Sequence, residues 1–103
     1  MKTQRHLDNL GVFHVAAEMR SAREKHGPKA SAHEAYAVIL EEVEEFWDEV
    51  KKKSQARCHA NMATELVQIA AAALLALTDL DLIAKAGDGW RSPPSPTEEP
   101  ASA

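Results

Sequence analysis

Residues 66–77 limit how this chain can fold more than any other segment, because Gln68 is the only polar side chain among them. A helix that is apolar on every side has to be buried on most of its sides. Four consecutive alanines at positions 70–73 would let a neighbouring helix approach closely. The segment is therefore predicted to be a buried helix that other helices cover.

Three helices are predicted along the chain, and each has a recognisable end signal. They run from between residues 3 and 9 to about residue 25, from residue 31 to about residue 53, and from about residue 56 to residue 85. Gly27 and Pro28 stop the first helix, because glycine suits the left-handed position at a helix end and proline prevents continuation. Ser31 and Glu34 form the S-x-x-E capping box that starts the second. Gly87 follows a basic last turn and stops the third.

These elements predict an all-α fold, an antiparallel bundle of three helices per chain. The short connection at residues 54–57 implies that the helices it joins are antiparallel neighbours. The low aromatic content, 5%, favours helices over sheet, and the helical domain is assigned to residues 1–86. Residues 87–103 hold four of the five prolines and are predicted to be a disordered tail. Because three helices cannot bury both sides of residues 66–77, we expect oligomerisation to complete the bundle in a homodimer or homotetramer.

Charge and cysteine content argue against several classes of function. The formal net charge of −4 argues against a general nucleic-acid binder and against a protein of acidic membrane surfaces. The N-terminus lacks the apolar core of a signal peptide, and the longest apolar run, residues 69–77, is shorter than the ~20 residues of a membrane span. Cys58 is the only cysteine, so no internal disulfide can form. We therefore expect a soluble, cytoplasmic protein.

Residues 36–50 combine an apolar stripe with six acidic side chains. The apolar residues recur at helical spacing, so Tyr36, Phe46 and Trp47 are expected in the core. The glutamates that fall together on the side away from that stripe are Glu42, Glu45 and Glu49. Like charges three and four residues apart destabilise a helix. We therefore expect a cation against this side, and the alternative is a solvated charged face.

A second carboxylate position complements the acidic helix. Glu65 stands one turn before Ile69, at the mouth of the apolar segment, where a carboxylate is costly unless it is paired or bound to a metal. The alternative is that it reaches solvent. Two helices joined by a short turn could bring together the pairs Glu42-x-x-Glu45 and Glu65-x-x-Gln68. Four oxygen ligands select hard cations such as Mg²⁺ or Mn²⁺ over zinc, and such a site usually holds a phosphate substrate as well.

The motif E-E-V-E-E-F, followed after a short turn by E-L-V-Q-I-A-A-A-A-L, resembles the MazG-like, all-α superfamily of nucleoside triphosphate pyrophosphohydrolases. That superfamily carries E-x-x-E on one helix and E-x-x-D on the next. The stretches R-S-A-R-E-K-H-G-P and H-E-A-Y-A-V-I-L-E-E are also similar to the family's lead-in, so the resemblance covers roughly residues 18–80. It implies that Glu42, Glu45 and Glu65 bind Mg²⁺, with Mn²⁺ as a substitute. It further implies that the ion activates a water that cleaves a (d)NTP to the monophosphate and pyrophosphate.

Gln68 departs from the family pattern, which usually has Asp at this position. A neutral amide oxygen removes one negative charge, so the site would hold metal less tightly. Three outcomes stay open: Gln68 coordinates weakly or through water, another carboxylate replaces it, or activity is reduced or lost. The carboxylates that could replace it are Glu41, Asp48 and Glu49. On this interpretation the catalytic carboxylates are Glu41, Glu42 and Glu45, with Glu41 as the candidate general base.

Basic and aromatic residues just beyond the acidic face are candidates for contacts with the substrate. Lys51, Lys52 and Arg57 could neutralise a triphosphate, although the two lysines also suit the C-terminus of a helix. Trp47 could stack on the nucleobase. A competing hypothesis, from a different class, is a non-catalytic helical oligomerisation module. In that module Gln68 marks a lost metal site and the acidic face binds a basic partner.

Overall fold

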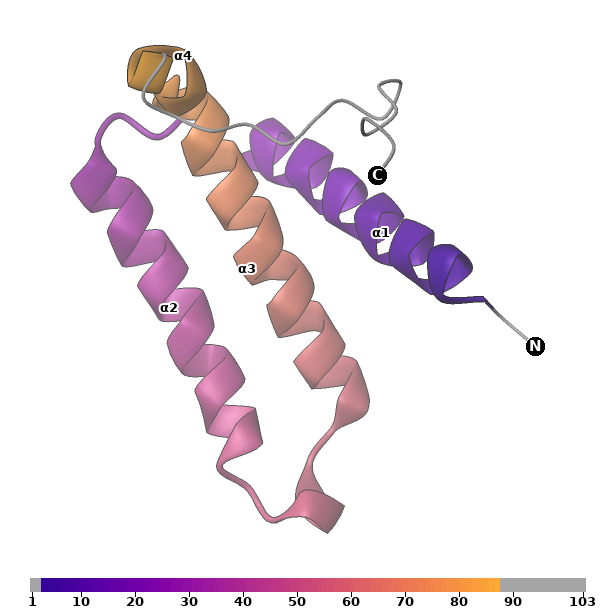
Figure 1. Ribbon diagram of the computed structural model, residues 1–103. Coiled ribbons are helices and arrows are strands. Elements are labelled where there is room, and N and C mark those ends of the chain that lie inside the picture. The colour runs from indigo at the N-terminus through magenta and orange to yellow at the C-terminus, as the bar shows by residue number, and fades with distance from the viewer. Residues whose placement is uncertain (1–2, 88–103) are drawn as a thin grey trace.

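The computed structural model describes residues 3–87, and every regular element among them is helical (Figure 1). In chain order these elements are α1 (Gln4–Lys25), α2 (Ala32–Val50), the short 3₁₀ helix η1 (Ser54–Ala56), α3 (His59–Asp79) and α4 (Leu82–Ala86). The prediction of an all-α fold is therefore confirmed for this part of the chain. The predicted tail lies outside the described residues, apart from Gly87.

The first two helices begin within their predicted bounds, and both are capped. The side chain of Thr3 accepts the N–H of His6 at the start of α1. The Ser31 hydroxyl accepts the N–H of Glu34 at 3.1 Å at the start of α2. Glu34 in turn reaches back to accept the N–H of Ala30 at 3.3 Å. The Thr3 and Ser31 caps satisfy backbone donors that the first turn of a helix leaves without a partner.

The connection between the second and third predicted helices is longer than expected. α2 ends at Val50 rather than at Lys53, and α3 begins at His59 rather than at Ala56. The Arg57 guanidinium donates to the carbonyl of Val50 at 2.9 Å and caps the last turn of α2. Lys51, Lys52 and Lys53, which fall inside the predicted bounds of this helix, therefore lie in the turn that follows it.

The third predicted helix is divided into two. α3 ends at Asp79, and Asp81 adopts the left-handed conformation, with φ of 53°, before α4 begins. Aspartate tolerates this conformation better than most residues, because its short polar side chain can hydrogen-bond locally. The predicted basic last turn and glycine stop then belong to α4, where Lys85 precedes Gly87. The described residues thus form four α-helices rather than three.

α3 is the helix against which the others pack. α2 lies alongside it, α1 crosses it at an angle, and α4 sits beyond its C-terminal end (Figure 1). Ala71, Leu75 and Ala76 of α3 are buried, as the apolar segment predicts. The prediction of burial on most sides does not hold within one described chain, because Leu66 and Leu74 of the same segment remain 49% and 40% exposed.

The core of the described chain is small. Its buried apolar residues are Ala35, Ala71, Leu75 and Ala76. Tyr36 and Trp47, which the apolar stripe of α2 places in a predicted core, are instead 65% and 57% exposed, so that prediction is wrong for a single chain. The physical reason is the orientation of α2, which turns Ala35, Glu42 and Glu49 toward α3 and its apolar stripe outward.

The length and apolar composition of α3 would also suit a membrane span. α3 spans 21 residues, and by length and composition it is the one described helix that could cross a membrane. The core helix of a soluble protein has the same properties, so this is weak evidence for a membrane location. α3 also carries Glu65, which faces carboxylates of α2, and charged side chains at the centre of a bilayer are costly.

Asp79 holds the end of α1 and the following loop against α3. Its carboxylate pairs with Arg23 at 2.8 Å and accepts the backbone N–H of Lys29 at 3.0 Å, and its side chain is only 4% exposed. Arg23 also donates to the Thr78 hydroxyl at 3.0 Å. The Lys29 N–H and the Arg23 guanidinium both hold the pKa of Asp79 below its ordinary value. This contact fixes the position of the α1–α2 loop relative to α2 and α3.

Replacing Asp79 with alanine should destabilise the fold. The change leaves the Lys29 N–H and the Arg23 guanidinium without their buried acceptor, which costs about 1–3 kcal/mol of the free energy of unfolding. The control is Asp48→Ala, which removes an exposed ion pair with Lys51 and should cost less than about 1 kcal/mol. Urea unfolding followed by circular dichroism measures both variants. Equal losses in the free energy of unfolding would contradict the role of Asp79 in holding α1 and the following loop against α3.

Candidate metal centre and the adjoining cleft

Three of the four predicted metal ligands lie together between α2 and α3. Glu42 and Glu45 are one turn apart on α2, and Glu65 lies on α3. One carboxylate oxygen of each lies within 4.8 Å of the others. The spacing E-x-x-E makes this possible, because residues three apart on a helix share a face. The pairing of the two motifs across neighbouring helices is therefore present in the fold.

Two oxygens of this acidic cluster are buried without a hydrogen-bond donor. They are Oε2 of Glu42 and Oε2 of Glu65. Within the described residues, no lysine or arginine forms an ion pair with any of the three carboxylates. Buried carboxylate oxygens without partners are costly, and grouping three carboxylates raises the cost further. The cluster therefore offers oxygen ligands, two of which lack a hydrogen-bond partner, and a bound cation would provide that partner.

The environment of the cluster favours the protonated carboxyl when no cation is present. Burial, followed by the charges of Glu45 and Glu65, raises the pKa of Glu42 from 4.5 to about 7. Burial and the neighbouring Glu45 also raise the pKa of Glu65. Glu41 adds a smaller repulsion at Glu42. At neutral pH the metal-free cluster is therefore partly protonated, and binding of a cation to its oxygens would displace that proton.

These shifts predict how the stability of the metal-free protein depends on pH. Folded Glu42 binds its proton more tightly than unfolded Glu42, so the free energy of unfolding should fall as the pH rises from 4.5 to about 7. Asp79 and Glu49 act oppositely, because their lowered pKa values cost stability only below their ordinary values of 3.8 and 4.5. In a chelator, the melting temperature should be several degrees higher at about pH 5.5 than at about pH 8.

The matched comparison is Glu42→Gln, which removes the carboxyl whose pKa is raised to about 7. Its melting temperature should change much less over the same pH range, because the glutamine cannot titrate. An unchanged pH dependence in Glu42→Gln would contradict the assignment of the effect to the cluster.

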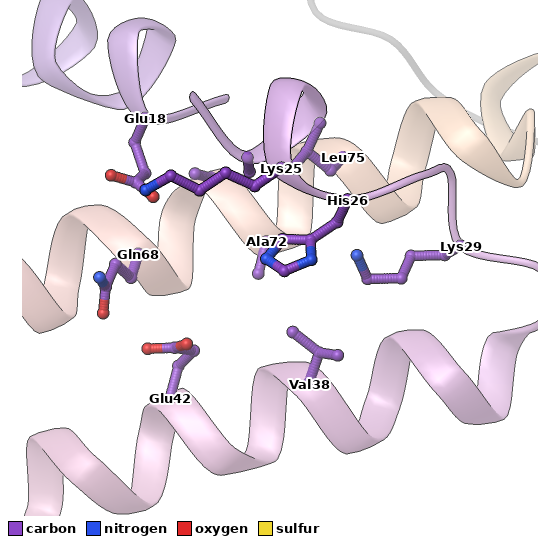
Figure 2. A pocket seen from close by; sticks show the side chains of 11 residues that line it. Glu18, Lys25, His26, Lys29, Val38, Glu42, Gln68, Ala72 and Leu75 are labelled. Atoms are coloured by element: carbon purple, nitrogen blue, oxygen red, sulfur yellow. The ribbon is translucent and has the colours of Figure 1, made fainter. Parts of the chain in front are cut away.

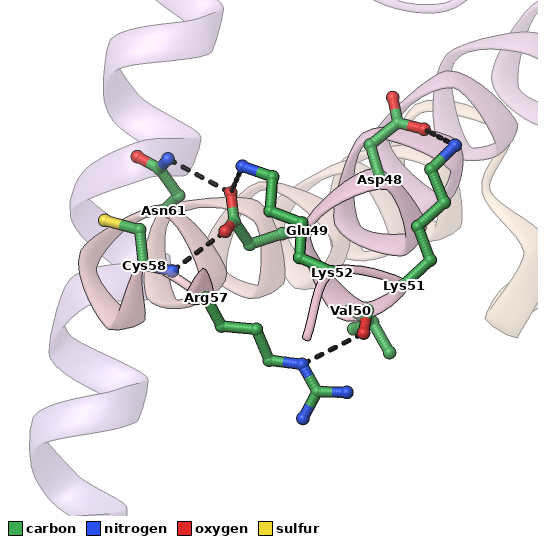
Figure 3. A network of polar contacts seen from close by, with 8 residues as sticks. All are labelled: Asp48, Glu49, Val50, Lys51, Lys52, Arg57, Cys58 and Asn61. Atoms are coloured by element: carbon green, nitrogen blue, oxygen red, sulfur yellow. Dashed lines mark hydrogen bonds and ion pairs between the residues drawn. The ribbon is translucent and has the colours of Figure 1, made fainter. Parts of the chain in front are cut away.

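Glu49, the third glutamate predicted on the acidic face, has a different role. It is 5% exposed, and its carboxylate accepts the N–H of Cys58 at 2.8 Å, the Asn61 amide at 3.2 Å and the Lys52 ammonium at 3.1 Å (Figure 3). The Cys58 and Asn61 bonds hold the pKa of Glu49 below its ordinary value. Glu49 thus joins the start of α3 to the end of α2. Glu49 is one of the candidates to replace the missing Asp, but its carboxylate already accepts these three hydrogen bonds.

A cleft of about 270 Å³ adjoins the cluster, between α2, α3 and the end of α1 (Figure 2). Glu42 and Gln68 line one part of it, so Gln68 shares a space with a residue of the acidic cluster. Glu18 of α1 and Val38 of α2 also line it. The remaining lining residues from α1 and α3 are small or apolar: Ala22, Ala71, Ala72 and Leu75.

Three basic side chains line the same cleft. They are Lys25 and His26 at the end of α1 and Lys29 in the loop that follows. In Figure 2, the His26 ring and the Lys29 side chain lie on the cleft side of this segment, across from α2. The cleft therefore has carboxylates at one end and basic side chains along another wall. Lys25 and His26 are not among the residues predicted from sequence to contact the substrate, although both lie in the R-S-A-R-E-K-H-G-P stretch that is similar to the family's lead-in.

The residues predicted to contact the substrate lie elsewhere. Lys51 pairs with Asp48 at 3.0 Å and Lys52 with Glu49 at 3.1 Å, while Arg57 caps α2 (Figure 3). None of these three basic residues lines the cleft, and neither does Trp47. Glu41 is exposed on α2 beside Glu42 and is not one of the three clustered carboxylates.

Comparison of the chain with protein-family models, with curated proteins and with solved structures finds no match.

Proposed function

We propose that this protein is a Mg²⁺-dependent nucleotide pyrophosphohydrolase that cleaves a (d)NTP to the monophosphate and pyrophosphate. One observation carries the proposal: the two buried, unpartnered carboxylate oxygens of Glu42 and Glu65 belong to a cluster that adjoins a cleft with three basic side chains. A metal-bound polyphosphate needs both features, since the ion requires oxygen ligands and the remaining phosphate charge requires cations.

The residues at the cluster fit a hard divalent cation. Glu42, Glu45 and Glu65 would hold Mg²⁺, or Mn²⁺ in its place, and the Gln68 amide oxygen would be a neutral fourth ligand. When bound, the ion would neutralise phosphate charge and lower the pKa of a water molecule. The orphaned oxygens of Glu42 and Glu65 support this assignment, because a cation would supply the partners they lack.

Other residues of the chain would bind the substrate and move a proton. Lys25, His26 and Lys29 would hold the phosphates in the cleft, a role that the sequence assigned to Lys51, Lys52 and Arg57. Glu41 lies beside Glu42 on the exposed side of α2 and would accept the proton of the attacking water. Trp47, the sequence's candidate for stacking on the base, does not line this cleft and lies on a different side of α2 from the acidic cluster.

The resemblance of the two acidic motifs to the MazG-like superfamily supports the same reaction class. On this proposal the protein acts in the cytoplasm on a nucleoside triphosphate, without a nucleic-acid or membrane partner. Its helices would form an antiparallel bundle that a second copy, or a tetramer, completes. The small core of the described chain supports that completion.

One observation favours the competing hypothesis of a non-catalytic oligomerisation module. Gln68, which lines the cleft beside Glu42, is neutral where the resembled family usually carries a fourth carboxylate. In such a module the acidic cluster would bind a basic partner, and the exposed apolar residues would serve assembly alone.

The test is release of monophosphate and pyrophosphate from a panel of NTPs and dNTPs with Mg²⁺ or Mn²⁺. Both products should form in equal amounts, and turnover should fall at least about 100-fold with a chelator and in Glu42→Gln, because the variant loses a metal ligand. Circular dichroism should show unchanged helicity in the variant. Absence of turnover across the whole panel with both metals would overturn the enzymatic proposal in favour of the module.

A matched pair of lysine variants tests the cleft within the same assay. Lys29→Ala should raise KM about tenfold, the effect of losing roughly 1.4 kcal/mol of binding, because this lysine lines the cleft. Lys51→Ala removes an equal charge from an exposed ion pair and should leave KM nearly unchanged. A larger rise in KM for Lys51→Ala than for Lys29→Ala would instead assign phosphate binding to Lys51.

A further inference from the structure

α2 carries four large apolar side chains that point away from the rest of the described chain. They are Tyr36, Leu40, Val43 and Trp47, here called the α2 stripe, and they are 65%, 38%, 41% and 57% exposed. Spacings of four, three and four residues place them on one side of the helix. The opposite side of α2 is the one that approaches α3 through Ala35, Glu42 and Glu49.

The order of residues in the α2 stripe is the same from either end. An aromatic residue, two aliphatic residues and a second aromatic residue follow one another, with the midpoint between Leu40 and Val43. A two-fold interface requires a surface that complements itself, so that residue i contacts residue j of the other copy and j contacts i. Two α2 helices packed antiparallel about this midpoint would meet that requirement.

We propose that the α2 stripe is the contact between two copies of this chain. In this dimer, Tyr36 of one copy packs against Trp47 of the other, and Leu40 packs against Val43 near the two-fold axis. Aromatic pairs of this kind gain stability from ring geometry in addition to the area they bury. The proposal does not depend on catalysis, because the stripe lies on a different side of α2 from the acidic cluster.

The exposed area fits a second copy. The uncovered parts of the four side chains amount to on the order of 400 Å² per copy, or about 800 Å² for two. Stable interfaces bury about 1,200–2,000 Å² in total. The partly buried neighbours on the same helix, Ile39, Phe46 and Val50, can supply the difference. The described core, with three alanines among its four buried apolar residues, also leaves a single copy with little apolar burial of its own.

A lipid bilayer is a poorer occupant of the same stripe. Helices that lie in a membrane surface are typically basic on their polar side. The polar residues of α2 that flank the stripe include Glu41, Glu44 and Asp48, which an anionic headgroup layer would repel. The observations therefore favour a second copy.

Disulfide cross-linking tests the partner and the direction of pairing. All variants carry Cys58→Ser, because Cys58 is exposed and would form its own cross-links. Oxidised Val43→Cys should give a covalent dimer, since position 43 lies next to the two-fold axis. Glu41→Cys, even nearer the midpoint along the helix but on another side, should stay monomeric on a denaturing gel. A cross-link at Glu41→Cys but not at Val43→Cys would overturn the proposal.

A mixture of two further variants fixes the register. Tyr36→Cys and Trp47→Cys should each cross-link poorly alone and efficiently when mixed, because antiparallel packing brings position 36 to position 47 of the other copy. Efficient cross-linking of Tyr36→Cys with itself would indicate parallel packing and contradict the proposal.

Light scattering of the unmodified chain completes the test. At micromolar concentration the mass in solution should be that of a dimer, or of a larger assembly, of the 11.3 kDa chain. Val43→Glu should lower this mass. A monomer in the unmodified chain would overturn the proposal. So would flotation with phosphatidylcholine–phosphatidylglycerol vesicles that Val43→Glu abolishes, which would assign the stripe to a membrane.

Discussion

Burial of carboxylates between α2 and α3 is the constraint on which the rest of the structure depends. α2 turns Glu42 and Glu49 toward α3, although burying a carboxylate is costly without partners. Glu49 is compensated by backbone and side-chain donors at the start of α3. Glu42 and Glu65 receive no such donor on their buried oxygens within the described chain. A divalent cation in the proposed site would provide that compensation, and the cleft lined by Lys25, His26 and Lys29 would then hold a polyphosphate beside it.

The same orientation of α2 accounts for the small core and for the proposed dimer. With its acidic side toward α3, the helix leaves Tyr36 and Trp47 on the outside. Three of the four buried apolar residues of the described chain are alanines, which contribute little apolar burial. Pairing of two α2 stripes would supply the missing burial without moving the carboxylates. The proposed site and the proposed dimer would thus both follow from the orientation of α2.

The features predicted well from sequence are those that local chemistry decides. Ser31 caps α2 because a serine hydroxyl reaches the N–H of Glu34 in its own first turn. The E-x-x-E spacing likewise brings Glu42 and Glu45 to one face. The orientation of α2 could not be predicted in this way, because periodicity shows that two faces are opposite but not which one meets a neighbour. Lys29 lies beside the cleft only because Asp79, 50 positions along the chain, binds its N–H. The break at Asp81 depends on a single left-handed residue that no periodic pattern marks.

Thermal unfolding with and without millimolar Mg²⁺ or Mn²⁺ tests the central claim most directly. Binding to the folded state alone stabilises it by about 2.7 kcal/mol when the ion is present at a hundred times its Kd, which raises the melting temperature of a chain this size by several degrees. The rise should occur in the unmodified protein and in Glu44→Gln, an exposed carboxylate of the same helix, and disappear in Glu65→Gln. A melting temperature that does not change with either ion, or that rises equally in Glu65→Gln, would contradict a metal site between α2 and α3.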